Sequence, residues 1–311
     1  MNLIAPGPLA LTVGIITVCL AALEVYVIWR NRAECRGDVE STEEATSLAE
    51  FSSPRSSTSP AVRLQTAALS INRDLSDSLY DVSIAIDLGE VVALIGIRGS
   101  GQSTVLRAIN GLIQVDSGNI VLDGDSLLGS NAVERFRWGL TYVPQDSPVF
   151  PFFSVEHNIR TVFKIKGVRS PEGTFRTRLE NLLDLCELGA VRKEAAAVLT
   201  ISQQRRLGLA MALAANPRFL LLDEPFSMYG TPEVVAVDAI INYARGQGIG
   251  VLIAEAELFA EHALSVADRG YVFSNGRIAA EGSRDELFAM AEAPKANDEV
   301  ISERQARRFP F

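Results

Sequence analysis

The chain has 311 residues, of which 48% are hydrophobic, 22% charged and 7% aromatic, so it is long and apolar enough to bury a sizeable core. Its formal net charge of -9 and its isoelectric point near 5.0 disfavour a protein that coats nucleic acid, because phosphate neutralisation needs an excess of Lys and Arg. The three cysteines are far apart and form no Cys-x-x-Cys motif, which indicates neither a disulfide framework nor a zinc site and favours a reducing compartment.

An apolar stretch of 21 residues, 9–29, predicts an N-terminal transmembrane helix. At ~1.5 Å per residue such a helix would be about 31 Å long, which matches the hydrocarbon core of a bilayer. Its single charge is Glu24, and arginines follow at positions 30, 32 and 36. The positive-inside rule then predicts that the rest of the chain is cytoplasmic. A cleaved signal peptide is the alternative, which the lack of Lys or Arg before residue 9 disfavours.

The composition divides the chain into four parts. Residues 1–30 form the predicted membrane anchor, and residues 31–60 are rich in Ser, Thr, Glu and Pro without any period, which predicts a disordered linker. Residues 61–290 carry the apolar runs of a folded domain, and residues 291–311 form a C-terminal tail.

Short apolar runs bounded by Gly and Asp predict strands in the folded domain, and helical patterns lie between several of them. The predicted strands are 62–71, 82–87, 90–97, 119–124, 139–145, 219–225, 250–255 and 269–276. The predicted helices are 104–113, 174–188, 202–217 and 232–247. The alternation of strands and helices predicts an α/β domain with a largely parallel sheet.

A glycine-rich segment between the strand at 90–97 and the helix at 104–113 matches a phosphate-binding loop at all but one position. The pattern is G-x-x-x-x-G-K-[S/T], whose glycines let backbone N–H groups surround phosphate oxygens at a helix N-terminus. Gln102 replaces the lysine, and a glycine-rich turn without a ligand is the alternative interpretation. The candidate nucleotide-binding residues of this loop are Gly96, Arg98, Gly99, Ser100, Gly101, Gln102, Ser103 and Thr104.

Further motifs follow in an order that resembles the nucleotide-binding subunits of ABC transporters, over about residues 63–290. Residues 142–145 resemble the Q-loop, 199–206 the signature, 219–225 the Walker B strand and 250–256 the switch strand. The resemblance is greatest to the subunits of lipopolysaccharide exporters and of branched-chain amino-acid transporters. It implies a P-loop NTPase domain with a helical subdomain, and it implies ATP and Mg²⁺ as cofactors.

The resemblance also implies roles for four residues that this sequence keeps. Ser103 and Gln145 would contact Mg²⁺, and Asp223 would supply a carboxylate to the metal's outer shell. Gln145 and Asp223 thereby join the cofactor-binding set, and Glu224 would be the catalytic residue that polarises the attacking water. Phosphoryl transfer depends mostly on positioning and charge neutralisation, so these residues favour retained binding of metal and nucleotide.

Other positions depart from the family pattern. Gln102 cannot place a cation between the β- and γ-phosphates. Ile201 and Ser202 replace two signature glycines, where a helix N-terminus approaches a partner subunit's nucleotide. The remaining departures are Ala256 at the switch histidine position, a D-loop at 227–230 without its aspartate, and no aromatic side chain near Arg73 to stack on adenine.

The retained and lost positions predict a membrane-anchored ABC ATPase-like subunit that binds ATP weakly and whose hydrolysis is lost or impaired. It would be a structural or regulatory part of a transport assembly in a bacterial-type inner membrane, with its ATPase-like domain in the cytoplasm. The expected partner is a transmembrane permease subunit, and in the runner-up interpretation the chain also pairs with an intact ATPase subunit. The competing interpretations are an active ATPase that energises export of lipopolysaccharide or another lipid or solute, and a scaffold that binds no nucleotide.

An aromatic cluster follows the Q-loop, and it leaves two interpretations open. The cluster consists of Phe150, Phe152 and Phe153. In the family, this region forms the groove that receives a helix of the transmembrane subunit, so an aromatic anchor for that partner is one prediction. Burial in the core of the chain's own helical subdomain is the other.

Overall fold

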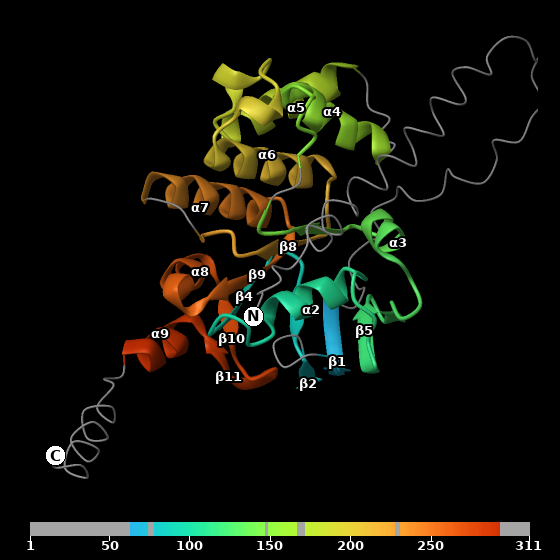
Figure 1. The fold of residues 1–311 in the computed structure, drawn as a ribbon, viewed down its shortest axis with the longest axis vertical. Coiled ribbons are helices and arrows are strands. Elements are labelled where there is room, and N and C mark those ends of the chain that lie inside the picture. The colour runs from blue at the N-terminus through green and yellow to red at the C-terminus, as the bar shows by residue number, and fades with distance from the viewer. Residues whose placement is uncertain (1–62, 74–77, 147–148, 167–171, 228–230, 293–311) are drawn as a thin grey trace, which may run out of the picture.

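The computed structural model describes residues 63–73, 78–146, 149–166, 172–227 and 231–292 (Figure 1). The predicted membrane segment at 9–29, the linker at 31–60 and nearly all of the C-terminal tail lie outside these ranges. Within the described ranges, no helix is both long enough and apolar enough to cross a membrane.

A six-stranded sheet in the order β11-β10-β4-β9-β8-β7 forms the centre of the described domain. Its parallel strands are β4 (Val91–Gly96), β7 (Leu140–Val143), β8 (Phe219–Asp223), β9 (Gly250–Ala256) and β10 (Arg269–Ser274), and β11 (Arg277–Ser283) pairs antiparallel with β10. Every residue of β4 and β8 is buried, as their continuous apolar sequences predict for inner strands of a parallel sheet.

A second, antiparallel sheet lies beside the first one. Its strands are β1 (Arg63–Ile71), β2 (Leu79–Val82), β3 (Ala85–Asp87), β5 (Ser117–Leu122) and β6 (Asp125–Ser126), and β1 pairs with β2, β3 and β5. The prediction of one largely parallel sheet is therefore wrong for the strands at 62–71, 82–87 and 119–124. Only short connections separate β1, β2 and β3, and short connections permit antiparallel pairing, whereas parallel strands need a long crossover.

The helices form two groups around the main sheet (Figure 1). The first group lies next to the sheets and contains α2 (Gln102–Ile109), α3 (Ala132–Arg137), α7 (Thr231–Gly246), α8 (Ala260–Val266) and α9 (Arg284–Glu292). The second group is α4 (Val155–Ile165), α5 (Glu172–Leu185) and α6 (Ile201–Ala214), which contact one another in the upper part of Figure 1 and form the predicted helical subdomain. The short 3-10 helices are η1 (Gly189–Val191), η2 (Ala196–Val198) and η3 (Glu257–Phe259).

Alternate side chains of β4 face two separate apolar clusters. Val91, Ala93 and Ile95 pack with residues of α6 and α7. Val92 and Leu94 pack with α2 and with the antiparallel sheet. Because side chains alternate along a strand, β4 is fixed from both faces, and so is the point at which its carboxyl end passes into the glycine-rich loop.

A buried arginine closes the far end of α2. The Nη1 atom of Arg135 donates to the carbonyl oxygens of Ala108 and Ile109, at 2.7 and 2.8 Å. Its Nη2 atom donates to the carbonyl of Leu127 at 2.8 Å, and its Nε atom donates to Ser130 Oγ at 3.0 Å. The last carbonyls of a helix lack full partners within the helix, so Arg135 adds donors at this end and ties α2 to α3.

Candidate functional site

The residues selected from the sequence meet at one edge of the main sheet. The loop 96–101 joins β4 to α2, Gln145 follows β7, Asp223 ends β8 and Glu224 comes next. These strands are parallel, so their carboxyl ends lie at the same edge, where open α/β sheets bind ligands. The structure therefore brings together the loop, the two carboxylates and the amide that the motifs predicted.

Asp223 accepts a hydrogen bond on each of its carboxylate oxygens. Ser103 Oγ donates to Oδ1 over 2.7 Å, and the Tyr142 hydroxyl donates to Oδ2 over 2.7 Å. Burial raises the pKa of Asp223, and the hydrogen bonds from Ser103 and Tyr142 oppose that rise. Burial, followed by the charge of Asp223, raises the pKa of Tyr142, so its hydroxyl keeps the proton that it donates. The part of Tyr142 in fixing Asp223 was not predicted from the sequence.

The hydroxyl of Ser103 and the carboxylate of Asp223 are a donor set that fits Mg²⁺. Both offer oxygen atoms, and Mg²⁺ prefers oxygen ligands and uses only one or two carboxylates where phosphates and water complete its shell. Gln145 is the other predicted metal contact, and its Nε2 atom donates to Glu224 Oε2 at 2.7 Å. Its amide oxygen would be the atom that holds a metal.

Glu224 is fixed by its backbone and by two side-chain donors. Its φ angle of 47° is uncommon for a residue other than glycine, and its backbone N–H donates to the carbonyl of Ala254 at 2.8 Å. Its Oε2 atom accepts from Gln145 Nε2 at 2.7 Å and from Arg98 Nη2 at 3.1 Å. The predicted catalytic carboxylate therefore carries an ion pair with the loop that precedes α2.

The side chain of Gln102 is folded into the glycine-rich loop. Its Oε1 atom accepts from Ser100 Oγ at 2.9 Å, and its Nε2 atom donates to the carbonyl of Glu255 at 3.4 Å. Gln102 is only 6% exposed. The residue that replaces the usual lysine is thus engaged inside the protein and supplies no charge to the surface of the loop.

Two glycines of the loop are required by close approaches of other atoms. A Cβ atom at Gly96 would lie 2.4 Å from the carbonyl oxygen of Phe273 and 2.9 Å from Gln102 Nε2. Gly101 has a φ angle of 112°, and a Cβ atom there would lie 2.6 Å from a methyl group of Leu79. Any side chain at either position would push the loop away from the strand end, so the loop depends on both glycines.

Glu255, a buried carboxyl behind the loop, was not predicted from the sequence. It is 1% exposed and accepts hydrogen bonds from the backbone N–H groups of Phe226 and Ala256, each at 3.0 Å. Burial raises its pKa to about 8, and the two backbone hydrogen bonds oppose this rise. An acidic residue at the end of an otherwise apolar strand was the signal that could have identified it.

Glu255→Gln should change how stability depends on pH. The pKa of Glu255 in the folded chain lies above its ordinary value of about 4.3, so its contribution to stability is full below that value and is lost as pH rises through about 8. Between pH 5 and pH 8.5 the wild-type chain should lose about 2–4 kcal/mol of stability that the Gln variant does not lose. One of the two backbone N–H groups would face the amide nitrogen of the Gln variant, and this lowers its stability equally at both pH values. Urea unfolding at both pH values measures this, with Glu257→Gln at an exposed neighbour as the control. Equal pH profiles for wild type and Glu255→Gln would contradict the prediction.

Helix α6 begins in the signature region, where it has a polar N-terminal cap and an exposed isoleucine. The Thr200 hydroxyl accepts from the backbone N–H of Gln203 at 3.2 Å, and the Gln203 side chain accepts from the Thr200 N–H at 3.0 Å. Ile201, at the first helical position, is 65% exposed, and Ser202 Oγ is buried without a hydrogen-bond partner in the described structure. Ile201 thus presents an apolar side chain beside the free N–H groups of the helix.

The other three departures from the family pattern are the D-loop, the missing aromatic residue near Arg73 and the switch position. Residues 228–230 of the D-loop lie outside the described ranges. The nearest aromatic residue to Arg73 along the sequence, Tyr80, has its ring 4.9 Å from the guanidinium carbon of Arg277. Ala256 ends β9 and offers only a methyl group to the site.

The aromatic cluster after the Q-loop divides between the two predicted alternatives. Phe150 and Phe153 have ring centroids 5.4 Å apart, and Phe150 packs against the core of the helical subdomain. The buried Asn158 fixes this turn by accepting from the Phe150 N–H at 2.7 Å and donating to the carbonyl of Phe153 at 3.2 Å. Phe152 is 91% exposed. Phe150 and Phe153 are therefore half-buried within the chain, and Phe152 is the exposed member of the cluster.

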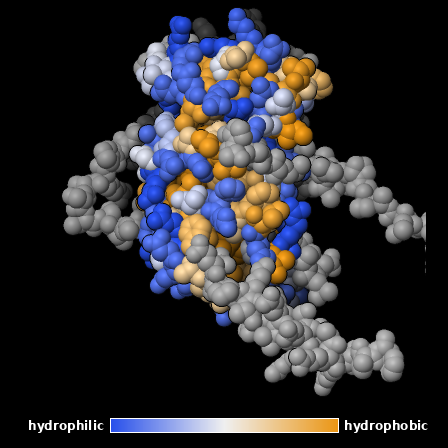
Figure 2. All heavy atoms as spheres, turned by 90° about the vertical axis from the view of Figure 1, so that its left-hand side faces the viewer, coloured by the Kyte–Doolittle hydropathy of each residue, from blue (hydrophilic) through white to orange (hydrophobic). Residues whose placement is uncertain are grey.

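Exposed apolar side chains also occur on other elements of the described surface. On the face drawn in Figure 2, which carries α7 and α8, apolar patches alternate with hydrophilic ones. The large exposed apolar residues include Ile97, Val198, Val235 and Leu258. They come from different elements, so Phe152 beside the Q-loop remains the clearest contact residue.

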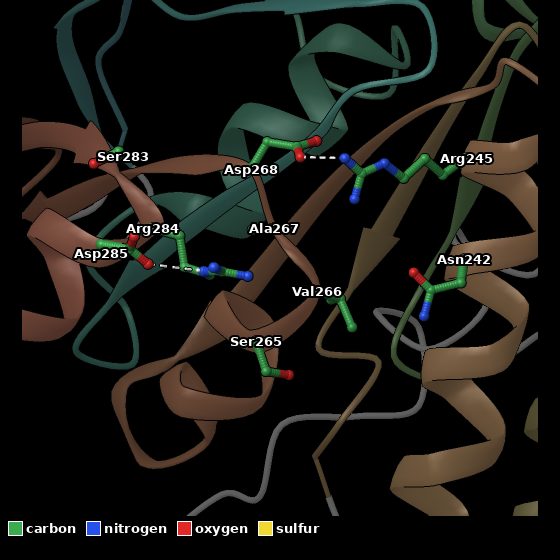
Figure 3. A pocket seen from close by; sticks show the side chains of 9 residues that line it. All are labelled: Asn242, Arg245, Ser265, Val266, Ala267, Asp268, Ser283, Arg284 and Asp285. Carbon is green, nitrogen blue, oxygen red and sulfur yellow. Dashed lines mark hydrogen bonds and ion pairs between the residues drawn. The ribbon is translucent and has the colours of Figure 1, made fainter.

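A cavity of about 290 Å³ opens at the opposite edge of the main sheet (Figure 3). Its guanidinium groups are paired with carboxylates, Arg245 with Asp268 and Arg284 with Asp285. Asp268 also accepts from the N–H of Val91 at 2.9 Å, at the first residue of β4. The loop 96–101 leaves the other end of β4, so this cavity does not belong to the site of the loop and the two carboxylates.

These features define a P-loop nucleotide-binding domain. They are a glycine-rich loop between a strand and a helix, and a hydroxyl, two adjacent carboxylates and an amide at the same sheet edge. A sequence model of the ABC transporter family matches residues 79–227. The lipopolysaccharide export system ATP-binding protein LptB of Escherichia coli K12 is 35% identical over 210 residues, which are 67% of this chain and 85% of LptB. A probable ABC transporter ATP-binding protein of Azorhizobium caulinodans is 35% identical over 210 residues, 67% of this chain and 73% of that protein. The chain belongs to the ABC transporter ATP-binding family.

Solved structures agree with this assignment. The ADP conformation of MJ1267, an ATP-binding cassette of an ABC transporter, has a TM-score of 0.64 and 24% identity, covers 78% of this chain and 99% of its own, and supports the fold. The cbiO1 protein of Clostridium perfringens, part of the ABC transporter complex cbiONQ, has a TM-score of 0.65 and 25% identity over 75% of this chain and 93% of its own. The resemblance and the P-loop ABC ATPase fold predicted from the motifs are therefore confirmed. The nucleotide roles of the individual residues stay predictions.

Proposed function

We propose that the chain is a nucleotide-binding subunit of an ABC-type membrane transport assembly, that it binds Mg-ATP weakly, and that its hydrolysis is lost or impaired. It would serve the assembly as a structural or regulatory subunit. The observation that carries this proposal is the position of Gln102, which is buried within the loop where the phosphate-binding cation belongs.

Retained binding is supported by the contacts that remain around the loop. Ser103 and Asp223 are already hydrogen-bonded in the described structure, and the same is true of Gln145 and Glu224. Ser103 and Gln145 would hold Mg²⁺, which neutralises phosphate charge when it is bound. The backbone N–H groups of the loop would surround the phosphates at the N-terminus of α2.

Impaired hydrolysis is supported by three independent positions. A lysine-to-glutamine change removes a charge-assisted contact that typically contributes ~2 to 4 kcal/mol to the transition state. The exposed side chain of Ile201 stands at the N-terminus of α6, where the family pattern has glycine. The side chain of Ala256 provides no hydrogen bond at the switch position.

A second candidate function is an active ATPase subunit that energises export of lipopolysaccharide or another lipid or solute. It is favoured by Glu224, which keeps the catalytic carboxylate beside Gln145. The identity of 35% to LptB, a subunit of a lipopolysaccharide export system, also favours it.

The partner that we propose is a transmembrane permease subunit, and in the runner-up interpretation the chain also pairs with an intact ATPase subunit. Phe152, which is exposed beside the Q-loop, would be an anchor for the permease. The apolar segment at 9–29 would hold the chain in a bacterial-type inner membrane with the domain in the cytoplasm. Retention of the full chain in membranes through alkaline carbonate extraction would support this anchor, and its release would exclude it.

Calorimetry and turnover measurements on the full-length chain separate the candidate functions. We expect Mg-ATP to bind with a dissociation constant of about 0.1–1 mM, because the loop and metal ligands remain while the lysine is lost. We expect phosphate release no faster than that of a Glu224→Gln variant. Turnover well above that of Glu224→Gln would establish the active ATPase, and no binding heat at millimolar Mg-ATP would establish the scaffold that binds no nucleotide.

A further inference from the structure

Arg98 is the one basic residue in the loop sequence 96–104, and it reaches across the site to a carboxylate. Its Nη2 atom lies 3.1 Å from Glu224 Oε2. The Arg98 side chain is 72% exposed, whereas only 14% of the Glu224 side chain is exposed. The positive charge that the loop lacks at Gln102 is therefore present four residues earlier, and it is paired with the predicted catalytic residue.

This ion pair is easy to break. It uses one nitrogen of Arg98 and one oxygen of Glu224, and that oxygen already accepts the shorter bond from Gln145 Nε2 at 2.7 Å. The guanidinium of Arg98 is largely in water, which competes for it, so the pair contributes little to stability. Glu224 would stay fixed by Gln145 and by its own backbone bond to Ala254 after Arg98 left.

A polyphosphate on the loop would offer Arg98 a better partner. A di- or triphosphate carries more charge than one carboxylate, and its oxygens suit the planar fork of a guanidinium, which binds phosphate with two parallel hydrogen bonds. Arg98 belongs to the loop itself, so its side chain can meet a phosphate held by the loop's backbone N–H groups through rotation about its own bonds. Gln102 cannot compete for this contact, since its amide is engaged with Ser100 and with the carbonyl of Glu255.

We infer that Arg98 exchanges partners when a nucleoside di- or triphosphate binds. Its guanidinium moves from Glu224 to the phosphate oxygens, and Glu224 Oε2 is then no longer in an ion pair. The inference rests on the proposed function, because it requires that the loop bind nucleotide. Two consequences follow. Arg98 supplies the charge that Gln102 lacks, and Glu224 competes with the nucleotide for Arg98 and thereby weakens binding.

A double-mutant cycle on the full-length chain tests the exchange. The proteins are wild type, Arg98→Gln, Glu224→Gln and the double variant, and the measurement is the Mg-ATP dissociation constant by calorimetry. Arg98→Gln should weaken binding about 10- to 30-fold, because a charge-assisted contact is lost. Glu224→Gln should tighten binding about three- to fivefold when Arg98 is present. The same change should alter binding less than twofold in the Arg98→Gln background.

Two controls show that these changes act at the site. Arg176→Gln removes the same charge from an exposed position on α5 and should leave the dissociation constant unchanged within twofold. Arg98→Gln without nucleotide should melt within about 2 °C of wild type, because an exposed ion pair adds little stability.

The possible outcomes distinguish the exchange from nucleotide binding itself. Equal tightening by Glu224→Gln in both backgrounds, or unchanged affinity of Arg98→Gln, overturns the exchange while nucleotide binding stands. Absence of binding in all four proteins overturns the proposed function and the exchange together. Weakening by Arg98→Gln, combined with loss of the Glu224→Gln effect, supports the exchange.

Discussion

Gln102→Lys should tighten Mg-ATP binding by about 30-fold and raise turnover much less. A charge-assisted contact to phosphate contributes ~2 kcal/mol or more, which corresponds to this factor. The loop can accept the change, because Ser100 Oγ and the carbonyl oxygen of Glu255 can both accept hydrogen bonds from an ammonium group. Turnover should stay low because Ile201 and Ala256 are unchanged. Calorimetry and phosphate release from the same preparation measure both quantities.

A variant that restores several family residues at once tests whether hydrolysis is impaired at several positions of the site. Adding Ala256→His, Ile201→Gly and Ser202→Gly to Gln102→Lys should be required before a substantial rate appears. Gln247→Lys adds the same charge at an exposed position after α7 and should alter neither binding nor turnover. If Gln102→Lys alone produced hydrolysis typical of the family, the signature and switch positions would not be the cause of the impaired turnover.

Arg135→Met should lower the free energy of unfolding by about 2–4 kcal/mol, because a buried side chain that makes four hydrogen bonds is lost. The substitution removes the guanidinium donor from the carbonyl of Ile109. It also removes one of several donors from the carbonyls of Ala108 and Leu127, which keep hydrogen bonds from Gly111 and Ser130. It also separates α2 from α3, and α2 carries Ser103 at its start. Urea unfolding measures the change.

Arg137 provides the matched control for this prediction, because it lies in the same helix and is exposed. Arg137→Met should change the free energy of unfolding by no more than about 0.5 kcal/mol. A loss below about 1 kcal/mol for Arg135→Met would mean that water replaces the guanidinium at the end of α2.

Local sequence patterns predict the elements of this fold better than their pairing. The continuous apolar runs of β4, β8 and β9 indicate buried strands because such runs fit only the inside of a sheet. Strand β11 was not predicted, since its residues are exposed or half-buried in alternation and offer little apolar signal. The pairing of Leu64 with Leu122 could not be predicted, because a strand's periodicity does not specify its neighbour.

In the candidate site too, patterns within one segment were predicted better than contacts between segments. Spacing within one segment is enough to identify the loop from Gly96 to Thr104 and the adjacent Asp223 and Glu224. The family resemblance also implied that Ser103, Gln145 and Asp223 lie together, but the ion pair of Arg98 with Glu224 was not predicted. The direction in which a side chain points depends on neighbours that only the folded chain assembles, and this is also why the burial of Glu255 was not predicted.

The hydrogen bond between Ser103 and Asp223 has an entropic consequence for metal binding. A free serine hydroxyl rotates among three staggered orientations and must lose that freedom when its oxygen becomes a ligand. In this chain the hydroxyl hydrogen is already directed at Asp223 Oδ1 over 2.7 Å, and that oxygen belongs to a carboxylate that Tyr142 immobilises from its other side. The lone pairs of Ser103 are thus oriented by folding itself, before any cation arrives. The entropy of ordering this ligand is therefore lost on folding and not on metal binding.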